Sequence, residues 1–225
     1  MVVSIKSKCL VGLLILAASP VVAQPTQAKF RRLFDGKSLK GWHGDARYWS
    51  VVDGAIVGNT HPDGRKKNTF LIADGEYHDF ILRVKFRLKN GASGVQFRSR
   101  MLSKKPEDKF LVTGYQADID NGGSTGEVYE EKGRSTLKRP DPAVVKKHFR
   151  KGEWNQFEIK MVGDEGVIRL NGHVTSRYKE TNAKIPRSGF VALQLQAGSG
   201  MEIAFKDVEI HELKPADSGR TRRNQ

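Results

Sequence analysis

The sequence predicts an all-β domain made of two packed antiparallel sheets, and three observations lead to this fold class. Apolar side chains recur at every second position, most clearly at Phe80, Leu82, Val84, Phe86 and Leu88, which is the period of a strand with one buried face. Asp-Gly and Asn-Gly pairs punctuate the whole chain and supply the positive φ angles that tight turns need. Only one segment has the pattern of a helix, so strands account for nearly all of the expected regular structure.

The alternating segments give about ten to twelve strands. Besides the segment that begins at Phe80, the expected strands are Tyr48–Val52, Thr69–Ala73, Ser93–Met101, Phe110–Asp120, Trp154–Met161, Gly189–Gln196 and Glu202–Glu212. Asn171-Gly172 is expected to turn a hairpin between the alternating segments on either side of it. Asp141 as a cap and Pro142 in the first turn predict a short helix that ends at His148.

The N-terminal residues 1–23 have the layout of a secretory signal peptide. Two lysines precede an apolar run from Cys9 to Ala18, and small residues follow it. The run is about half of the roughly 20 residues that span a bilayer, so we expect a periplasmic or secreted protein without a membrane span. Cys9 is the only cysteine and would be removed with the signal. The domain is then expected over residues 24–214, followed by a flexible basic tail at residues 215–225.

The 225-residue chain carries 39 Lys and Arg against 25 Asp and Glu, a formal net charge of +14. These cations are scattered over the alternating segments, so a solvated basic surface is the simplest interpretation. No nucleic-acid partner is expected, and an acidic or sulfated polysaccharide is the alternative partner for such a surface. The sequence has no phosphate-binding loop, dinucleotide fingerprint, zinc helix or serine-hydrolase elbow, and no feature that specifies an oligomeric state. The six histidines show no metal-binding spacing, so neither a metal nor an organic cofactor is expected.

Three expected strands carry polar side chains on the face opposite their apolar residues. The polar residues are Gln96, Arg98 and Arg100 on one strand, Gln116, Asp118 and Asp120 on the next, and Gln194 and Gln196 on a third. If the first two strands are neighbours, Arg98 and Asp118 can meet across the sheet. One interpretation is a salt-bridged face exposed to water. The other is a polar cleft for a hydroxyl-rich ligand, because amides and guanidinium groups bond well to hydroxyls.

Three further features lie beside these strands in the sequence. The Gly-rich segment Asn121–Gly126 leads to Glu127, and loops of this kind beside a polar face often carry sites. His61 lies in a turn-rich stretch from which it could reach a cleft, although a surface position is the simpler interpretation. Trp42 is expected to pack in the core, with stacking on a sugar as the alternative.

Short motifs follow one another along the chain in a characteristic order. They are Leu33-Phe34-Asp35-Gly36, Gly41-Trp42, Trp49-Ser50-Val51, Asp53 to Gly58, Asn68-Thr69-Phe70-Leu71, Ser93 to Arg100, Gly114 to Ile119, Trp154-Asn155, Asn171-Gly172 and Phe205-Lys206-Asp207-Val208. No single motif is decisive, but the ordered set covers essentially the whole mature chain. In this order the chain resembles the 3-keto-disaccharide hydrolase domain family.

The resemblance implies a concanavalin A-like jelly-roll sandwich that acts on an oligosaccharide or glycoside already oxidised at C3 of the sugar. A ketone at C3 acidifies the C2 proton, so a base can remove it, an acid can assist departure of the C1 oxygen, and water can then add. Placing the polar face in the family's cleft assigns three roles: proton acceptor for Asp118 or Asp120, acid for Glu127 or His61, and enolate stabilisation for Arg98 or Gln116. The residues expected to bind the substrate are Gln96, Arg98, Arg100, Tyr115, Gln116, Gln194, Gln196 and Trp42.

Gln196 departs from the family's pattern, because many relatives have a histidine at this position. A histidine titrates near neutral pH and a glutamine does not. The alternative function is therefore a non-catalytic carbohydrate-binding sandwich that uses the same face.

Overall fold

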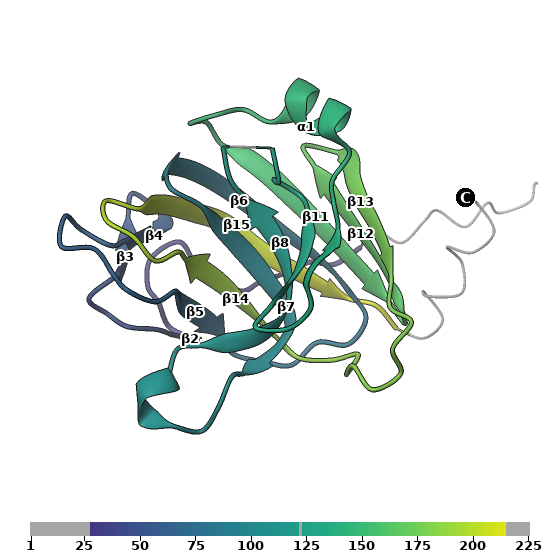
Figure 1. Ribbon diagram of the computed structural model, residues 1–225, viewed down its shortest axis with the longest axis horizontal. Helices are drawn as coiled ribbons and strands as arrows, with labels where there is room; N and C mark the ends of the chain where they lie inside the picture. The colour runs from purple at the N-terminus through teal and green to yellow at the C-terminus, as the bar shows by residue number, and fades with distance from the viewer. Residues whose placement is uncertain (1–27, 122, 215–225) are drawn as a thin grey trace, which may run out of the picture.

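A computed structural model describes residues 28–121 and 123–214. Their strands form two antiparallel sheets that stack on each other, so strands of the two layers overlap in the view of Figure 1. Sheet A has the strand order β13 (His173–Lys179), β12 (Glu165–Leu170), β11 (Asn155–Val162), β6 (Phe80–Asn90), β15 (Glu202–Glu212), β4 (Ala55–Asn59) and β3 (Trp49–Val52), with β1 (Arg31–Arg32) paired to β15. Sheet B has the order β10 (Ser135–Lys138), β9 (Val128–Glu131), β8 (Val112–Ile119), β7 (Ser93–Met101), β14 (Phe190–Leu195), β5 (Thr69–Ala73) and β2 (Trp42–His43).

The inward faces of the two sheets enclose one hydrophobic core. β6 runs through the middle of sheet A, and its inward residues from Phe80 to Leu88 are at most 2% exposed. Val95 on β7 and Leu193 on β14 belong to the same core from the side of sheet B. Burying one large apolar side chain contributes roughly 1.5–3 kcal/mol, so this layer holds the two sheets together. The two-sheet all-β fold predicted from the period of two is confirmed.

Most expected strands are present close to their expected bounds. β5, β7 and β15 begin and end at the expected residues, and Asn171-Gly172 turns the hairpin between β12 and β13. The expected strands did not include β9 and β10. Glu130 and Glu131 on β9 are buried although they are charged, so this strand lacks the alternation of apolar and polar residues that marks the others.

The expected short helix is α1 (Pro142–His148), which lies beside β13 at the top of the view in Figure 1. The Asp141 carboxylate caps it, accepting hydrogen bonds from the backbone N–H groups of Ala143 at 2.9 Å and Val144 at 3.3 Å. A single 3₁₀ turn, η1 (Pro106–Asp108), lies in the connection between β7 and β8. Both elements are on connections, so the two sheets alone form the frame of the site.

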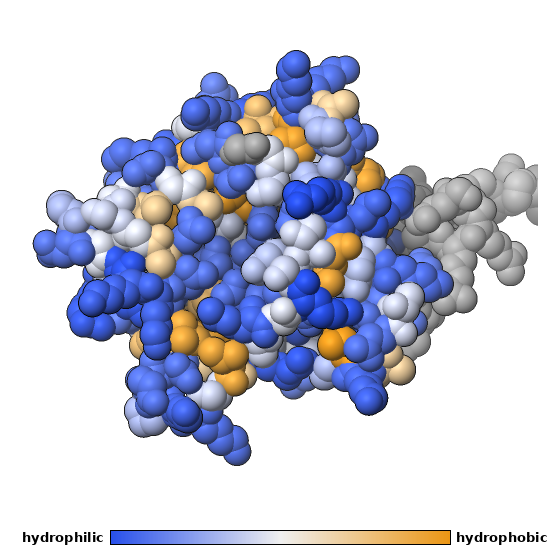
Figure 2. All heavy atoms as spheres, in the orientation of Figure 1, coloured by the Kyte–Doolittle hydropathy of each residue, from blue (hydrophilic) through white to orange (hydrophobic). Residues whose placement is uncertain are grey.

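The expected signal peptide at residues 1–23 and the expected basic tail at residues 215–225 lie outside the described residues. Within the described ranges, no helix is long and apolar enough to cross a membrane. Figure 2 shows one face of the molecule, on which hydrophilic residues cover most of the surface and hydrophobic residues form small separate groups. The surface on this side is therefore largely polar, in keeping with a chain of which 28% is charged.

Candidate functional site

Five polar side chains lie together on the outer face of sheet B, away from the apolar core. They come from three neighbouring strands, because β7 lies between β8 and β14. Four of them are buried and Asp118 is partly exposed. Buried polar groups need hydrogen-bond partners, and these residues provide partners for one another. We call this group the amide cluster, and its members are Gln96, Ser99, Gln116, Asp118 and Gln194.

Gly94 makes room for the amide cluster at its centre. In the antiparallel register, Gly94 on β7 pairs with Gln194 on one side and with Asp118 on the other. A Cβ atom at Gly94 would lie 2.3 Å from Cδ of Gln116, so a side chain there would displace that amide. Because Gly94 has no side chain, Gln116 can lie across β7 and reach Gln194.

The amide cluster forms one directed chain of hydrogen bonds. The Ser99 hydroxyl donates to Oε1 of Gln96 at 2.7 Å, and the Gln96 amide donates to Oε1 of Gln116 at 2.7 Å. The Gln116 amide then donates to Oδ1 of Asp118 at 2.7 Å and to Oε1 of Gln194 at 3.4 Å. Among the described residues, Oδ2 of Asp118 and the amide nitrogen of Gln194 have no hydrogen-bond partner. These two groups are free to contact a ligand.

The surroundings of Asp118 raise the pKa of its carboxyl to about 7. Burial is the largest cause, because the charged form loses its contact with water. The hydrogen bond from Gln116 lowers the pKa, and the negative charges of Glu127, Asp120 and Glu131 raise it again. A carboxyl that titrates near neutral pH can both accept and donate a proton, as general acid–base catalysis requires.

Two further buried carboxyls lie at the two ends of β9. Burial raises the pKa of Glu131, and the positive charge of Lys132 and the side chain of Asn68 lower it by less. The Glu127 carboxylate accepts a hydrogen bond from Oγ1 of Thr136 at 2.6 Å and lies 3.8 Å from the Arg139 guanidinium. Glu127 is thus held by a donor and a cation, whereas burial is the dominant influence on Glu131 and raises its pKa.

A β-bulge in β7 determines which side chains reach the outer face. Gln96 and Ser99 are three residues apart on β7, whereas their partners on β14, Ala192 and Phe190, are two residues apart. The extra residue is Arg98, whose φ of 48° lies in the left-handed region. The extra residue shifts the alternation of inward and outward side chains by one position. Ser99 therefore lies on the same face as Gln96, and Arg98 and Arg100 do not. The expectation that both arginines share the face of Gln96 is therefore wrong.

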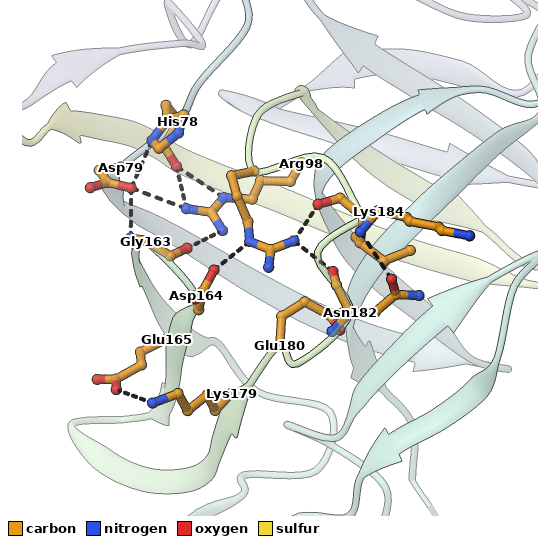
Figure 3. A network of polar contacts seen from close by, with 12 residues as sticks. His78, Asp79, Arg98, Gly163, Asp164, Glu165, Lys179, Glu180, Asn182 and Lys184 are labelled. Carbon is orange, nitrogen blue, oxygen red and sulfur yellow. Dashed lines mark hydrogen bonds and ion pairs between the residues drawn. The ribbon is translucent and has the colours of Figure 1, made fainter.

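Arg98 instead joins the two sheets from the inside, as Figure 3 shows. Its side chain is 0% exposed, and it donates to the carbonyl oxygen of His78 from Nε at 2.9 Å and from Nη2 at 2.6 Å. Nη1 donates to the carbonyl oxygen of Gly163 at 2.8 Å, and Nη2 lies 3.1 Å from Oδ1 of Asp79. The expected contact with Asp118 does not form. Since the protein encloses the guanidinium, Arg98 cannot contact a substrate or stabilise an enolate.

Tyr115 and Trp42 also face the core, which corrects their expected role in substrate binding. Tyr115 is 2% exposed and donates to the Glu180 carboxylate at 2.5 Å. Trp42 is 6% exposed and its Nε1 donates to the carbonyl oxygen of Leu33 at 2.8 Å. Both rings belong to the hydrophobic core, so of the two interpretations of Trp42, core packing is correct.

The remaining expected residues lie at the edge of this region. Oδ1 of Asp120 accepts hydrogen bonds from the backbone N–H groups of Gly123 at 3.0 Å and Ser124 at 2.9 Å, so this carboxylate orders the loop after β8. His61 is exposed in a loop, and Gln196 follows the last residue of β14. In the described part of the chain, neither side chain has a hydrogen bond to the amide cluster. The expected residues that the fold brings together are Gln96, Gln116, Asp118 and Gln194.

Ser99 and Glu131 were absent from the residues expected at the site. The signal for Ser99 is a pair of glycines that lie against the bulge from its two sides, Gly114 on β8 and Gly189 just before β14. No comparable signal marks Glu131, whose burial depends on the position of β9 in the sheet. Within residues 28–121 and 123–214, no group of three His, Cys, Asp or Glu side chains is placed to hold a metal ion.

Solved structures share this architecture at low sequence identity. A candidate glycosyl hydrolase from Parabacteroides distasonis is 22% identical, with a TM-score of 0.60 over 82% of this chain and 100% of that chain. The carbohydrate-binding module CBM66 from Bacillus subtilis is 16% identical, with a TM-score of 0.56 over 76% of this chain and 96% of that one. The kappa-carrageenase from Pseudoalteromonas carrageenovora, solved with an oligotetrasaccharide of kappa-carrageenan, is 8% identical, with a TM-score of 0.56 over 86% of this chain and 98% of that one. These likenesses establish the fold, and the expected jelly-roll sandwich is confirmed.

The family follows from the sequence match. A search of curated proteins found no match for the chain. Residues 29–211 match the 3-keto-alpha-glucoside-1,2-lyase-like domain. This range includes all the strands described above apart from Glu212, the last residue of β15. The resemblance drawn from the order of short motifs is thereby confirmed, and the chain belongs to the 3-keto-alpha-glucoside-1,2-lyase-like domain family.

Proposed function

We propose that the protein cleaves 3-keto-glycosides at the amide cluster, with Asp118 as the base. The family and the structural neighbours indicate a glycosyl hydrolase-like or carbohydrate-binding sandwich. The observation that carries the more specific proposal is the carboxyl of Asp118, which has a pKa of about 7 and ends a chain of buried amides. An expected export to the periplasm or the medium, which stays a prediction from residues 1–23, would bring such an enzyme to external glycosides.

The proposed reaction is an elimination across C1 and C2 of the oxidised sugar. Asp118 takes the C2 proton, and the electron pair of the C2–H bond forms an enolate with the C3 ketone. The enolate then collapses to a C1–C2 double bond, the bond from C1 to the leaving oxygen breaks, and that oxygen takes up a proton. Addition of water to the double bond would complete a net hydrolysis. Asp118 suits the first step because a raised pKa makes its carboxylate a stronger base.

The proposed partners of Asp118 come from the same face. Glu131 is assigned as the acid, because burial raises its pKa, and two carboxyls with raised pKa values can divide the roles of base and acid. Glu127 is less suited, since Thr136 and Arg139 hold its carboxylate. The free amide nitrogen of Gln194 is assigned as the donor to the enolate oxygen.

The second candidate function is carbohydrate binding without cleavage. Gln196 favours it, because this residue stands where many relatives have a histidine. A chain of amides also suits the recognition of sugar hydroxyls. Under this alternative, Asp118 contributes to affinity and no bond is broken.

The deciding experiment incubates the purified protein with a 3-keto-glucoside and, in parallel, with the unoxidised parent glucoside. We expect release of the aglycone from the keto form alone, and slower release when the C2 hydrogen is replaced by deuterium. The variant Asp118→Asn should slow release about 10³-fold. Asp120→Asn is the matched control, because asparagine keeps the Oδ1 acceptor that orders the loop and should retain most of the activity.

Two results would contradict the proposal. Equal release from both glucosides would exclude chemistry at the C2 proton. Full activity of Asp118→Asn would remove Asp118 as the base. Calorimetric binding of a panel of 3-keto-glycosides without any release would instead establish the carbohydrate-binding function.

A further inference from the structure

We propose that the outer face of sheet A carries a second saccharide site, which binds an acidic polysaccharide through Arg87, Lys206 and Trp154. This face is on the opposite side of the sandwich from the amide cluster. The site therefore would not hold the substrate that is cleaved. It would attach the protein to a polymer whose sugars bear carboxylate or sulfate groups.

A groove of about 790 Å³ lies on this face over β3, β4, β15 and β6. Its floor consists of small side chains, because Ala204 on β15 pairs with Val57 on β4, and Ala55 lies on the same strand as Val57. Long side chains from β6 and from the segment before β11 form its walls, among them Trp154 and Arg87. A volume between about 300 and 1,000 Å³ is typical of small-ligand sites, so the groove has room for a short stretch of a sugar chain.

Most cations on this face are already paired with carboxylates. On β6, Arg83 lies 3.0 Å from Glu158, Lys85 lies 2.8 Å from Asp207, and Lys89 lies 3.1 Å from Glu202. The charges of these cations are therefore compensated within the protein, and they offer little to an anionic ligand.

Arg87 and Lys206 differ from these neighbours. Among the described residues, neither has an ion pair with a carboxylate, and both lie against Trp154. The Arg87 guanidinium is 4.9 Å and the Lys206 ammonium is 4.2 Å from the centroid of the Trp154 ring. Cation–π contacts of this kind restrain the two side chains, so two positive charges without a carboxylate partner converge at one wall of the groove. The groove is also lined by Lys89 and by the carboxylates of Asp53 and Glu202, of which Glu202 is paired with Lys89.

This arrangement fits an acidic saccharide. A carboxylate or sulfate group can lie between the two cations, whose mutual repulsion it relieves. The apolar face of the same sugar can pack on the floor of Ala55, Val57 and Ala204. A nucleic acid fits less well, because it needs a longer series of phosphate contacts and an open ring for base stacking, whereas cations already lie over the ring of Trp154.

The test is calorimetric titration of the purified protein with tetragalacturonate and with a sulfated tetrasaccharide, at about 50 mM NaCl to limit screening. We expect binding of at least one of them and no binding of neutral cellotetraose; the stronger of the two identifies the anionic group. Replacing both cations, Arg87→Gln with Lys206→Gln, should weaken this binding about tenfold. The matched control is Arg83→Gln with Lys85→Gln, which changes the net charge equally but removes paired cations that lie outside the groove, and should weaken binding less than about twofold. The variant Asp118→Asn should leave the binding of the acidic tetrasaccharide unchanged.

Three results would overturn the proposal. One is the absence of binding to both acidic tetrasaccharides. Another is equal weakening by the two double variants, because a diffuse positive surface and not the groove would then be responsible. The third is tighter binding of a single-stranded oligonucleotide that the Arg87 and Lys206 replacements abolish. None of these results depends on cleavage activity, so this test and the test of the proposed function can fail separately.

Discussion

Tyr115 and Gln116 are consecutive residues of β8, yet they belong to two different buried polar networks on opposite faces of sheet B. Tyr115 points inward and donates to Glu180 at 2.5 Å. Gln116 points outward and donates to Asp118 at 2.7 Å. Each network therefore brings a carboxyl group to β8, and the two carboxyls can be compared directly.

The inner network compensates its carboxylate with a cation. Arg134 donates to both oxygens of Glu180, at 2.6 and 3.1 Å, and Tyr178 adds a hydrogen bond at 2.9 Å. Burial by itself raises the pKa of Glu180, but the hydrogen bonds from Arg134 and Tyr115 outweigh it and hold the pKa well below its usual range. Glu180 stays charged at neutral pH, and we assign it a structural role.

The outer network has amides where the inner one has a guanidinium. Amides can satisfy the hydrogen bonds of Asp118, but they bring no positive charge to oppose burial, and three neighbouring carboxyls add negative charge. The pKa therefore rises to about 7. The comparison indicates that the cation beside Glu180, which Asp118 lacks, is what lets one buried carboxyl stay charged while the other titrates near neutral pH.

The largest expected effect is that of Asp118→Asn, which should change catalysis and stability in opposite directions. We expect kcat for the 3-keto-glucoside to fall about 10³-fold, in the range of a lost acid–base group, while stability rises. A folded-state pKa raised above the ordinary value destabilises the native state once pH exceeds that ordinary value, so at pH 8 the variant should be more stable by roughly 1–3 kcal/mol. At pH 3 Asp118 is protonated in both the folded and the unfolded wild-type protein, so the difference in stability between the variant and wild type should vanish. Urea unfolding at the two pH values measures this, and a variant that is less stable than wild type at pH 8 contradicts the assignment.

The second prediction removes the cation from the inner network. Arg134→Ala should destabilise the protein by about 2–3 kcal/mol at pH 7, because it leaves the Glu180 carboxylate buried without its charge partner. A group with a lowered folded-state pKa contributes stability at pH values above its ordinary pKa, and this contribution is lost as the pH falls. The difference from wild type should therefore shrink below about pH 4. Arg134→Lys is the control that keeps the charge, and a loss of stability independent of pH would show that packing and not charge is responsible.

The smallest expected effect comes from Gln116→Leu, which removes the one hydrogen bond that lowers the pKa of Asp118. The acidic limb of the pH profile of kcat/KM should move up by roughly one unit, because more of Asp118 then keeps its proton at neutral pH. Gln96→Leu is the matched control, since Gln96 donates to Gln116 and not to Asp118. Equal shifts in the two variants would mean that general loosening of the face, and not the direct hydrogen bond, sets the pKa.

The alternation of apolar and polar residues predicts the outward-facing side chains correctly wherever no bulge intervenes. Gln96, Gln116, Asp118 and Gln194 were all expected on polar faces, and the register of β14, β7 and β8 brings them together. Arg98 and Arg100 were misplaced because one extra residue in β7 shifts the parity. That bulge depends on close approach of the neighbouring strands, where a Cβ at Gly114 or Gly189 would come within 2.7 Å of Ser99, and no count along a single strand can reveal it.

The sequence by itself determined the all-β class, most of the strands, the helix cap at Asp141, the family and four of the five residues of the amide cluster. These follow from local patterns, namely a period of two, turn pairs, a capping residue and ordered motifs. Only the tertiary structure decided that Ser99 joins the cluster, that Arg98 joins the two sheets, and that Asp118 titrates near neutral pH while Glu180 does not. The physical reason is that burial and the proximity of a charge are set by strands far apart in the chain, and a carboxyl responds to those surroundings and not to its neighbours in sequence.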